Sequence, residues 1–449
     1  MTTNSNIKLD LDTDKNKSIC PYPFNHSYIG PLYERKLCCI SDDVNELKKT
    51  TLLEFWNSEK MKQVRLDMLE GKPIKECTKC YDFEKSNVES LRQLAAKDHQ
   101  RFDIPLENIA EDGTMLSGPT YFDHRTIHCN FQCVSCGYHY SSSHINLQKE
   151  MWNTHLDFVI DYYYERQAGL DIINALEKKE CSSIYWAGGE PFMSHMHWDV
   201  VEKMYELHKD DEYKEYIESI LVHYNTNLSK SVWKNKRIVN LIEFYQPSIQ
   251  ASIDGTHETF EYCRDGGNWE ETAKNWDEFY SALNKNKQFG IASVLSSPVI
   301  MDIDRWFDFF EKYDVKVYNH KNFTNNRIEL QHSFLDVRLF PQHIFDRIIN
   351  HAIDRFSKST LIGRERSIDI LQSYAAEKKQ NSSTFSDPAI LKTIKLKTMH
   401  RDKFLKTNRT YDQLLKIIDK EAYEWYMNID MTVDATKYKT IQIKSDNGN

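Results

Sequence analysis

Short apolar runs alternate with longer helical patterns between residues 118 and 325. Strands are expected over residues 120–127, 184–187, 221–224, 248–253, 291–295 and 315–318. Between these runs, apolar side chains recur every three or four positions, which is typical of helices that bury one face. Alternation of this kind predicts a parallel sheet whose strands are joined by right-handed helical crossovers. The segment is therefore predicted to be an α/β domain with six strand–helix units.

The segments on either side of this pattern are predicted to differ from it. Residues 1–18 are rich in Asn, Thr, Lys and Asp, and we expect a disordered tail. Residues 19–117 contain a helical run at 59–70 that Gly71 and Pro73 should end. Residues 326–449 carry apolar positions at helical spacing and are predicted to form a mainly helical region.

The composition narrows the class of protein. With 449 residues, 40% of them hydrophobic and 12% aromatic, the chain is predicted to be globular. Its net charge of −9 argues against nucleic acid as a partner, because binding to a phosphate backbone needs a basic surface. The chain has neither an apolar run long enough for a membrane span nor an N-terminal signal segment, so we expect a cytoplasmic protein without a membrane partner. Ten cysteines in such a chain indicate metal binding or catalysis more than disulfides.

Three cysteines, Cys129, Cys133 and Cys136, follow the first predicted strand at the spacing C-x3-C-x2-C. Because a four-iron cluster normally takes four cysteines, three in one loop would leave one iron open to another ligand. Zinc is an alternative, since a structural zinc site could recruit His128 or His139 as a fourth ligand. The thiols could also be plain buried cysteines.

A Gly-Gly-Glu-Pro segment, residues 188–191, ends the second predicted strand. The glycines allow a ligand to approach the backbone closely, and Glu190 offers a carboxylate to a cation such as an amino group. The triplet followed at this distance by Gly-Gly-Glu-Pro resembles the radical S-adenosylmethionine (radical SAM) superfamily. The resemblance implies a partial (β/α)6 barrel, a four-iron, four-sulfur (4Fe–4S) cluster on the three cysteines, and S-adenosylmethionine (SAM) on the open iron. It also implies that Gly188, Gly189 and Glu190 hold the methionine amino group.

Further SAM contacts follow from the same resemblance. Asn225 closes the third predicted strand, and Ser252 closes the fourth within Ser-Ile-Asp-Gly. The family pattern implies that Ser252 and Asn225 contact the nucleoside side of SAM and that Arg264 reaches the methionine carboxylate. Turn formation is the simpler explanation for polar residues at strand ends. Cys263 is a candidate hydrogen-atom donor on a loop, although an ordinary buried thiol is the more common case.

Four other cysteines form a second set, C-x17-C followed by C-x2-C: Cys20, Cys38, Cys77 and Cys80. Four thiolates suit a structural zinc ion and an iron–sulfur cluster equally. The set resembles the twitch subdomain, a shortened relative of the SPASM domain, which accompanies some radical SAM barrels and here would precede the barrel. The resemblance implies that these four cysteines bind an auxiliary 4Fe–4S cluster, with Cys39 as an alternative to Cys38.

The family resemblance also implies a reaction. The first cluster reduces SAM, the 5′-deoxyadenosyl radical abstracts a hydrogen atom from a peptide or protein side chain or from a small molecule, and the auxiliary cluster aids oxidation or binds the substrate. Flavodoxin or ferredoxin is the expected electron donor. The predicted organisation is a tail (1–18), a twitch-like region (19–117), a barrel (118–325) and a C-terminal helical region (326–449). The alternative is a non-catalytic zinc-binding interaction protein that uses both cysteine sets structurally.

Overall fold

The computed structural model describes residues 18–42, 50–85, 89–98, 104, 106–152, 161–283, 288–321, 334–407 and 409–434. The chain divides into two compact units. The first unit comprises the chain up to Cys129 with residues 157–226 and 232–248, and the second comprises residues 130–156, 227–231 and the chain from Ile249 onward. The predicted disordered tail lies outside the described residues apart from Ser18.

The first unit is built around parallel strands. They are β1 (His26–Ile29), β2 (Arg35–Lys36), β3 (Tyr121–Thr126), β4 (Ser183–Gly188) and β5 (Leu221–Thr226). Their order is β5-β4-β3-β1-β2, and the neighbours are parallel except for β1 with β2. The strand β4 is buried on both faces for most of its length, as expected of a parallel strand inside an α/β fold.

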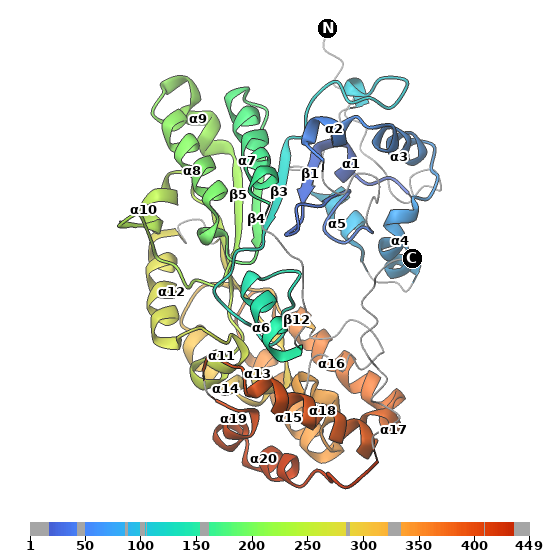
Figure 1. The fold of residues 1–449 in the computed structure, drawn as a ribbon, viewed down its shortest axis with the longest axis vertical. Helices are drawn as coiled ribbons and strands as arrows, with labels where there is room; N and C mark the ends of the chain where they lie inside the picture. The colour runs from blue at the N-terminus through green and yellow to red at the C-terminus, as the bar shows by residue number, and fades with distance from the viewer. Residues whose placement is uncertain are drawn as a thin grey trace. The chain divides into compact units, whose positions relative to one another are not determined.

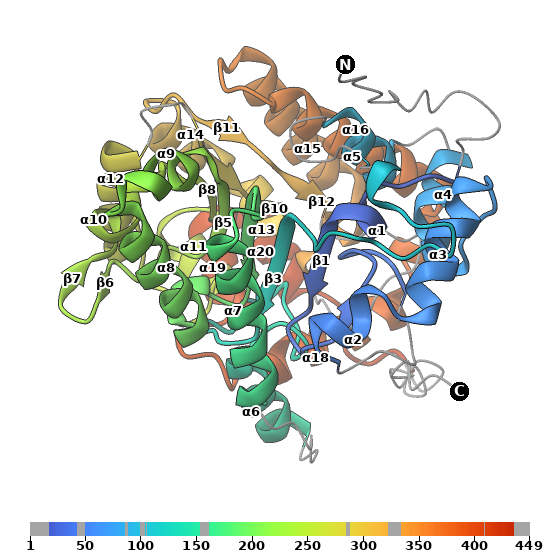
Figure 2. The ribbon, with the colours of Figure 1, turned by 90° about the horizontal axis from the view of Figure 1, so that it is seen from above.

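Helices accompany these strands. In Figure 1, α7 (Tyr162–Glu177), α8 (His195–His208) and α9 (Asp211–Ser219) accompany β4 and β5. Figure 2 shows α7 and α8 beside each other. The connection that follows β5 contains only a short helix, although helical spacing was predicted between the strands. Trp233 belongs to β6 (Val232–Trp233), which pairs with β7 (Lys236–Arg237), and α10 covers only Ile238–Ile242. The reason is local, because Lys234 and Asn235 have φ values of 46° and 61° and turn the chain into a hairpin.

The region before β3 forms its own apolar cluster in the first unit. Its helices are α1 (Tyr22–Asn25), α2 (Leu52–Trp56), α3 (Glu59–Leu69), α4 (Thr78–Lys85) and α5 (Leu91–Lys97), with short 3-10 turns η3 (Lys75–Cys77) and η4 (Leu106–Asn108). Ser58 caps α3 by accepting a hydrogen bond from the Met61 amide, and Gly71 follows its end with a φ of 78°. This confirms the predicted helix at 59–70.

The two strands of this region, β1 and β2, were not predicted. The strand β1 runs parallel to β3, with His26 opposite Tyr121 and Ile29 opposite His124. The buried ring of His26 lies against Tyr121, with 4.7 Å between ring centroids. The cysteine-rich N-terminal region therefore contributes a strand beside the first predicted strand of the α/β segment.

The second unit contains the later strands and the C-terminal helices. Its parallel strands lie in the order β8 (Ser248–Ser252), β9 (Phe289–Ala292), β11 (Lys316–Val317), and β10 (Val294–Leu295) pairs with β12 (His320–Lys321). Its helices are α6 (Ser142–Trp152), α11 (His257–Cys263), α12 (Trp269–Leu283), α13 (Ser297–Met301), α14 (Ile303–Phe310), α15 (Gln342–Lys358), α16 (Arg364–Gln380), α17 (Ser382–Phe385), α18 (Pro388–Asp402), α19 (Tyr411–Ile418) and α20 (Lys420–Met427). The long helices α15 and α16 lie side by side (Figure 2).

The strand predicted at residues 291–295 is interrupted. It forms β9 and β10, with Ser293 between them. The Asp254 carboxylate accepts the Val294 amide at 2.7 Å, which takes that donor out of a continuous strand ladder. The carboxylate thus ends the strand at Ala292.

The observed fold confirms the α/β class with mainly parallel strands, and helices fill the described part of residues 326–449 as predicted. The partial barrel and the boundaries at residues 118 and 326 stay predictions. Within the described part of the chain, helices of a length and apolarity that would cross a membrane are absent.

Candidate functional site

Backbone hydrogen bonds join the Gly-Gly-Glu-Pro segment to the stretch that precedes the cysteine triplet. Thr126, the last residue of β3, lies opposite Gly188, the last residue of β4. Beyond the strands, the Gly189 amide donates to the Thr126 carbonyl at 2.6 Å and the Glu190 amide donates to the His128 carbonyl at 2.6 Å. His128 is bonded covalently to Cys129, so the Gly-Gly-Glu-Pro segment lies beside the start of the cysteine triplet, at the carboxyl ends of adjacent parallel strands.

The two glycines are required by this close approach. Gly188 has a φ of +102°, and a Cβ there would lie 2.2 Å from the Thr126 carbonyl oxygen. A Cβ at Gly189 would lie 2.2 Å from the His128 carbonyl oxygen. Both clashes involve backbone atoms, which cannot swing aside as a side chain would. The glycines therefore permit the junction between the motifs.

The Glu190 carboxylate is fully buried and ordered by its neighbours. Its oxygen atoms accept a hydrogen bond from the Thr226 hydroxyl at 2.9 Å, and one of them also accepts the Phe192 amide at 3.1 Å. The amide contact caps the 3-10 turn η5 (Pro191–Met193). The carboxylate thus stands fixed beside the end of β5. Thr226 was not predicted as a site residue, although it is a polar residue at the end of a strand, which is the feature that selected the adjacent Asn225.

A second unpredicted contact set lies beside the same junction. The His128 imidazole contacts Glu165 on α7 at 3.2 Å, and the Ser194 hydroxyl donates to Glu165 at 3.0 Å. Burial alone would raise the pKa of Glu165, but the hydrogen bonds from His128 and Ser194 lower it below its ordinary value. These side chains connect the residue before Cys129 to the start of α8. Nothing in the local sequence around Glu165 indicates this pairing.

The cysteine triplet crosses from one unit to the other. Cys129 is the last residue of its segment in the first unit, whereas Cys133 and Cys136 belong to the second. Cys133 is buried, and Cys129 and Cys136 are half-buried. Burial raises the pKa of the Cys133 thiol, and the Arg264 guanidinium, whose Nη1 lies 3.8 Å from Sγ, opposes that rise. An ionised thiolate at Cys133 would therefore rely on nearby positive charge.

Arg264 forms an ion pair with another residue of the second unit. Its Nε lies 2.8 Å from Oδ2 of Asp254, which is almost fully buried. Burial alone would lower the pKa of Arg264, but Asp254 and Cys133 together raise it. The guanidinium therefore stays charged beside Cys133. The predicted contact with a methionine carboxylate stays a prediction.

The other candidate residues have varied surroundings. Asn225 lies on β5, and its Oδ1 is buried without a hydrogen-bond partner in the described chain. Ser252 is the last residue of β8 and is half-buried. Cys263 ends helix α11, not a loop as expected, and only 1% of its surface is exposed. Burial raises the pKa of the Cys263 thiol. Asn225 thus offers an unused acceptor at a strand end, and Cys263 is enclosed.

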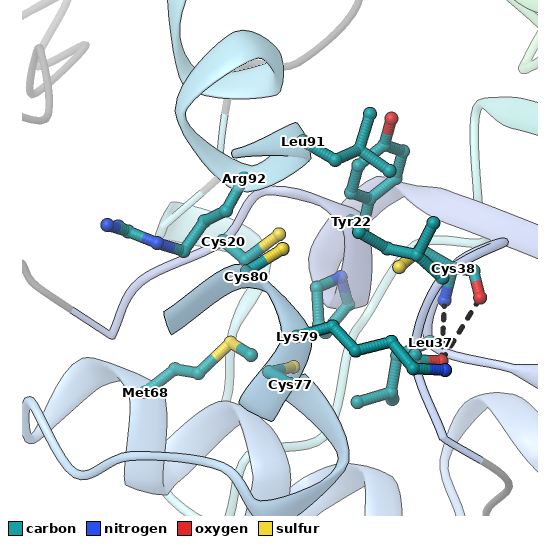
Figure 3. A pocket seen from close by; sticks show the side chains of 13 residues that line it. Cys20, Tyr22, Leu37, Cys38, Met68, Cys77, Lys79, Cys80, Leu91 and Arg92 are labelled. Carbon is teal, nitrogen blue, oxygen red and sulfur yellow. Dashed lines mark hydrogen bonds between the residues drawn. The ribbon is translucent and has the colours of Figure 1, made fainter. Parts of the chain in front are cut away.

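The four cysteines of the second set line one pocket in the first unit (Figure 3). Cys20, Cys38, Cys77 and Cys80 face a space of about 390 Å³, open solvent included. The remaining lining is largely apolar: Tyr22, Pro23, Leu37, Ile40, Met68 and Leu91, with Ser41, Lys79 and Arg92. Cys38 is part of the lining and the adjacent Cys39 is not.

The electrostatics of this pocket disfavour four bare thiolates. Burial raises the pKa of Cys20, and negative charge on Cys38, Cys77 and Cys80 would raise it further. Burial likewise raises the pKa of Cys77 to about 12, with Cys80 adding to the effect. In the described chain no three His, Cys, Asp or Glu side chains form a group that would hold one metal ion. The four cysteine thiols of the lining match the donor preference of an iron–sulfur cluster and also that of zinc.

Comparisons with known proteins give structural similarity only. No protein-family model matches the chain, and neither does any curated protein. The chain is similar to the solved structure of polyhistidine-tagged anSMEcpe with bound AdoMet, with 17% identity, a TM-score of 0.36, and coverage of 53% of this chain and 57% of that one. It is also similar to Streptococcus suis SuiB bound to S-adenosylmethionine, with 13% identity, a TM-score of 0.34, and coverage of 68% and 65%. The chain is similar as well to SuiB bound to the precursor peptide SuiA, with 14% identity, a TM-score of 0.33, and coverage of 64% of this chain and 60% of that one. The chain thus spans little more than half the length of anSMEcpe.

Proposed function

We propose that this chain is a radical SAM enzyme that acts on a peptide or protein side chain or on a small molecule. The observation that carries the proposal is the hydrogen-bonded junction between the Gly-Gly-Glu segment and the residues before Cys129. It supports one shared site for the two motifs whose resemblance to the superfamily is most specific. In parallel α/β folds, ligands bind at the carboxyl ends of the strands, where this junction lies.

The proposed cofactor set has named ligands. Cys129, Cys133 and Cys136 would hold a 4Fe–4S cluster, and Gly188, Gly189 and Glu190 would hold the methionine part of SAM. Asn225, Ser252 and Arg264 would make further contacts to SAM. When bound, the cluster supplies the electron for reductive cleavage of SAM to a 5′-deoxyadenosyl radical, which takes a hydrogen atom from the substrate.

The protein's own residues would bind and orient SAM and would hold charge near the cysteine thiols. The Glu190 carboxylate, fixed by Thr226, would accept a charge-assisted hydrogen bond from the methionine ammonium group. The Asn225 Oδ1 would accept from a hydroxyl group of the nucleoside, which would satisfy a buried acceptor that lacks a partner in the described chain. The Arg264 guanidinium would keep positive charge next to Cys133. These roles use groups already held in place by the fold.

The proposal is tested by anaerobic reconstitution followed by incubation with SAM and dithionite. We expect about eight irons per chain, from one cluster on each cysteine set, and formation of 5′-deoxyadenosine. A protein that binds iron at both sites but never forms 5′-deoxyadenosine would contradict the proposal.

Glu190→Gln should weaken SAM binding by about ten- to a hundredfold, because a charge-assisted hydrogen bond contributes roughly 1.5–3 kcal/mol. The amide can still accept from Thr226, so the fold of the junction should survive. Calorimetry of the reconstituted protein measures the dissociation constant, and circular dichroism checks the fold. An unchanged dissociation constant would count against the role of Glu190.

Removal of the auxiliary thiols should separate SAM cleavage from turnover. Cys77→Ala with Cys80→Ala should leave uncoupled 5′-deoxyadenosine formation with dithionite intact, because these residues line a pocket that contains no residue of the triplet. Substrate conversion should be lost if the second cluster accepts an electron or binds the substrate. Four thiolates on a metal can also contribute folding energy, so circular dichroism and the remaining iron are measured first. A folded variant with about four irons that forms no 5′-deoxyadenosine would show that the sites are coupled.

The substrate and the redox partner are also part of the proposal. We infer a peptide or protein side chain before a small molecule, on the proposal that the long helical region after residue 333 shapes a groove for an extended substrate. The electron would come from a flavodoxin or a ferredoxin. Incubation of the reconstituted enzyme with SAM and either reduced donor, in place of dithionite, tests that part through 5′-deoxyadenosine formation.

A further inference from the structure

Contacts within the second unit tie the cysteine loop to a segment of the chain about 270 residues further on. Lys406, which follows α18, donates from Nζ to the Asn130 carbonyl at 3.2 Å. Asn130 is the residue directly after Cys129. Its side-chain oxygen accepts from the Ser229 hydroxyl at 3.0 Å, so both its backbone and its side chain are held.

Asp265 also contacts both the cysteine loop and the segment that contains Lys406. Its carboxylate accepts the Lys406 amide at 3.0 Å and the Thr407 amide at 2.9 Å. Its own carbonyl accepts the Gln132 amide at 2.7 Å, inside the cysteine loop. Asp265 is fully buried, which makes it costly to leave any of these groups unpaired. One residue thus fixes both the loop and the distant segment.

Close packing reinforces the arrangement. The Val134 amide, next to Cys133, donates to the Cys263 carbonyl at 2.9 Å. A Cβ at Gly266 would lie 3.2 Å from the Asn130 carbonyl oxygen and 3.3 Å from the Lys406 side chain. The cysteine loop, the end of α11 and residues 405–407 are therefore closely packed against one another.

We infer that Lys406 and Asp265 are positioning residues that hold the cysteine loop in its ligand-presenting form, so that the C-terminal helical region is a working part of the SAM-cluster site. This inference rests on the proposed function for the identity of the cluster. The loop between Cys129 and Cys136 has no helix or strand of its own, so its shape depends on contacts from outside. Two of its amides and one of its carbonyls are bound by the residues named above.

The test compares Lys406→Met with Lys403→Met, a matched exposed lysine of the same segment. In the metal-free full chain, hydrogen exchange of the Gln132 and Val134 amides should be about two- to fivefold faster in Lys406→Met, the effect of losing one exposed charge-assisted hydrogen bond. Lys403→Met should match the wild type. Lys406→Arg keeps a charged donor and should restore slow exchange. Equal exchange in the two methionine variants would overturn the inference.

Two buried aspartates, Asp265 and Asp402, provide a second comparison of a variant with its control. Asp265→Asn should also loosen the loop, because the carboxylate accepts the Lys406 and Thr407 amides on separate oxygens and the asparagine NH2 group would replace one of these acceptors with a donor. Asp402→Asn is the control, since Asp402 is also buried and accepts the Tyr411 amide at 2.7 Å. It should lower the melting temperature without changing exchange in the cysteine loop. Faster loop exchange in Asp402→Asn equal to that in Asp265→Asn would show general loosening and overturn the specific role.

Spectroscopy links the loop to the site. In reconstituted protein, the electron paramagnetic resonance spectrum of the reduced cluster and its change on addition of SAM should differ between Lys406→Met and Lys403→Met. If loop exchange rises but both spectra stay identical to wild type, the contacts do not position the cluster and the inference is overturned. If the wild type itself takes up no iron on the triplet, the proposed function fails, which is distinct from failure of Lys406→Met to respond.

Discussion

Replacement of Cys129, Cys133 and Cys136 together with alanine should reduce the iron content from about eight to about four per chain and abolish 5′-deoxyadenosine formation. The physical reason is that the only ligands proposed for the SAM-binding cluster are these three thiols. The auxiliary pocket lies among Cys20, Cys38, Cys77 and Cys80, which the change leaves untouched. Iron analysis after anaerobic reconstitution and chromatography of the reaction mixture measure the two effects.

Two single variants serve as controls for the loss of thiols as such. Cys181 and Cys263 are each only 1% exposed and belong to neither set. Cys181→Ala and Cys263→Ala should retain all the iron and form 5′-deoxyadenosine at the wild-type rate. Retention of about eight irons in the triple variant would rule out the assignment of the triplet.

Gly188→Ala should separate the two motifs and abolish SAM binding. An alanine Cβ would meet the Thr126 carbonyl oxygen at 2.2 Å and the Thr126 nitrogen at 2.7 Å, at a φ of +102° that alanine rarely adopts. Relief of the clash requires β4 to move away from β3 and breaks the contacts of the Gly189 and Glu190 amides. A loss of about 2–4 kcal/mol in the free energy of unfolding is expected from such strain. Chemical denaturation and SAM calorimetry measure the two effects.

The matched control is Gly137→Ala, next to Cys136. A Cβ at Gly137 would meet no heavy atom within 4 Å, and Gly137 does not have a positive φ. This variant should match the wild type in stability and in SAM affinity. If Gly188→Ala is as stable as Gly137→Ala and binds SAM equally well, the junction between the motifs does not organise the site.

Periodicity in the sequence predicted most of the elements that follow β3. Each of the six predicted strand segments contains a strand, α3 matches the helix predicted at 59–70, and α8, α12 and α14 lie between the strands, where helical spacing was predicted. These elements bury one face or both, so their patterns are strong. The strand β1 was missed because its four residues, His-Ser-Tyr-Ile, carry no run of apolar residues and gain their stability from pairing with β3.

The candidate site was predictable where chemistry is local in sequence and unpredictable where it is not. The Gly-Gly-Glu-Pro pattern selected a segment that the structure bonds to His128, the residue before the first cysteine of the triplet, and the assignment of the site residues stays a prediction. The contact of Lys406 with Asn130 spans 276 positions, and no short pattern signals a pair at that separation. Likewise, the break after Ala292 depends on the distant carboxylate of Asp254.

Electron paramagnetic resonance of the anaerobically reconstituted, dithionite-reduced protein, with and without SAM, tests the central claim most directly. SAM that binds the open iron of the triplet's cluster should change the signal of one of two clusters, and the change should be absent in the triple cysteine variant. A colourless protein that carries zinc at both cysteine sets, or a spectrum that SAM leaves unchanged, would contradict the proposed function and favour a zinc-binding interaction protein.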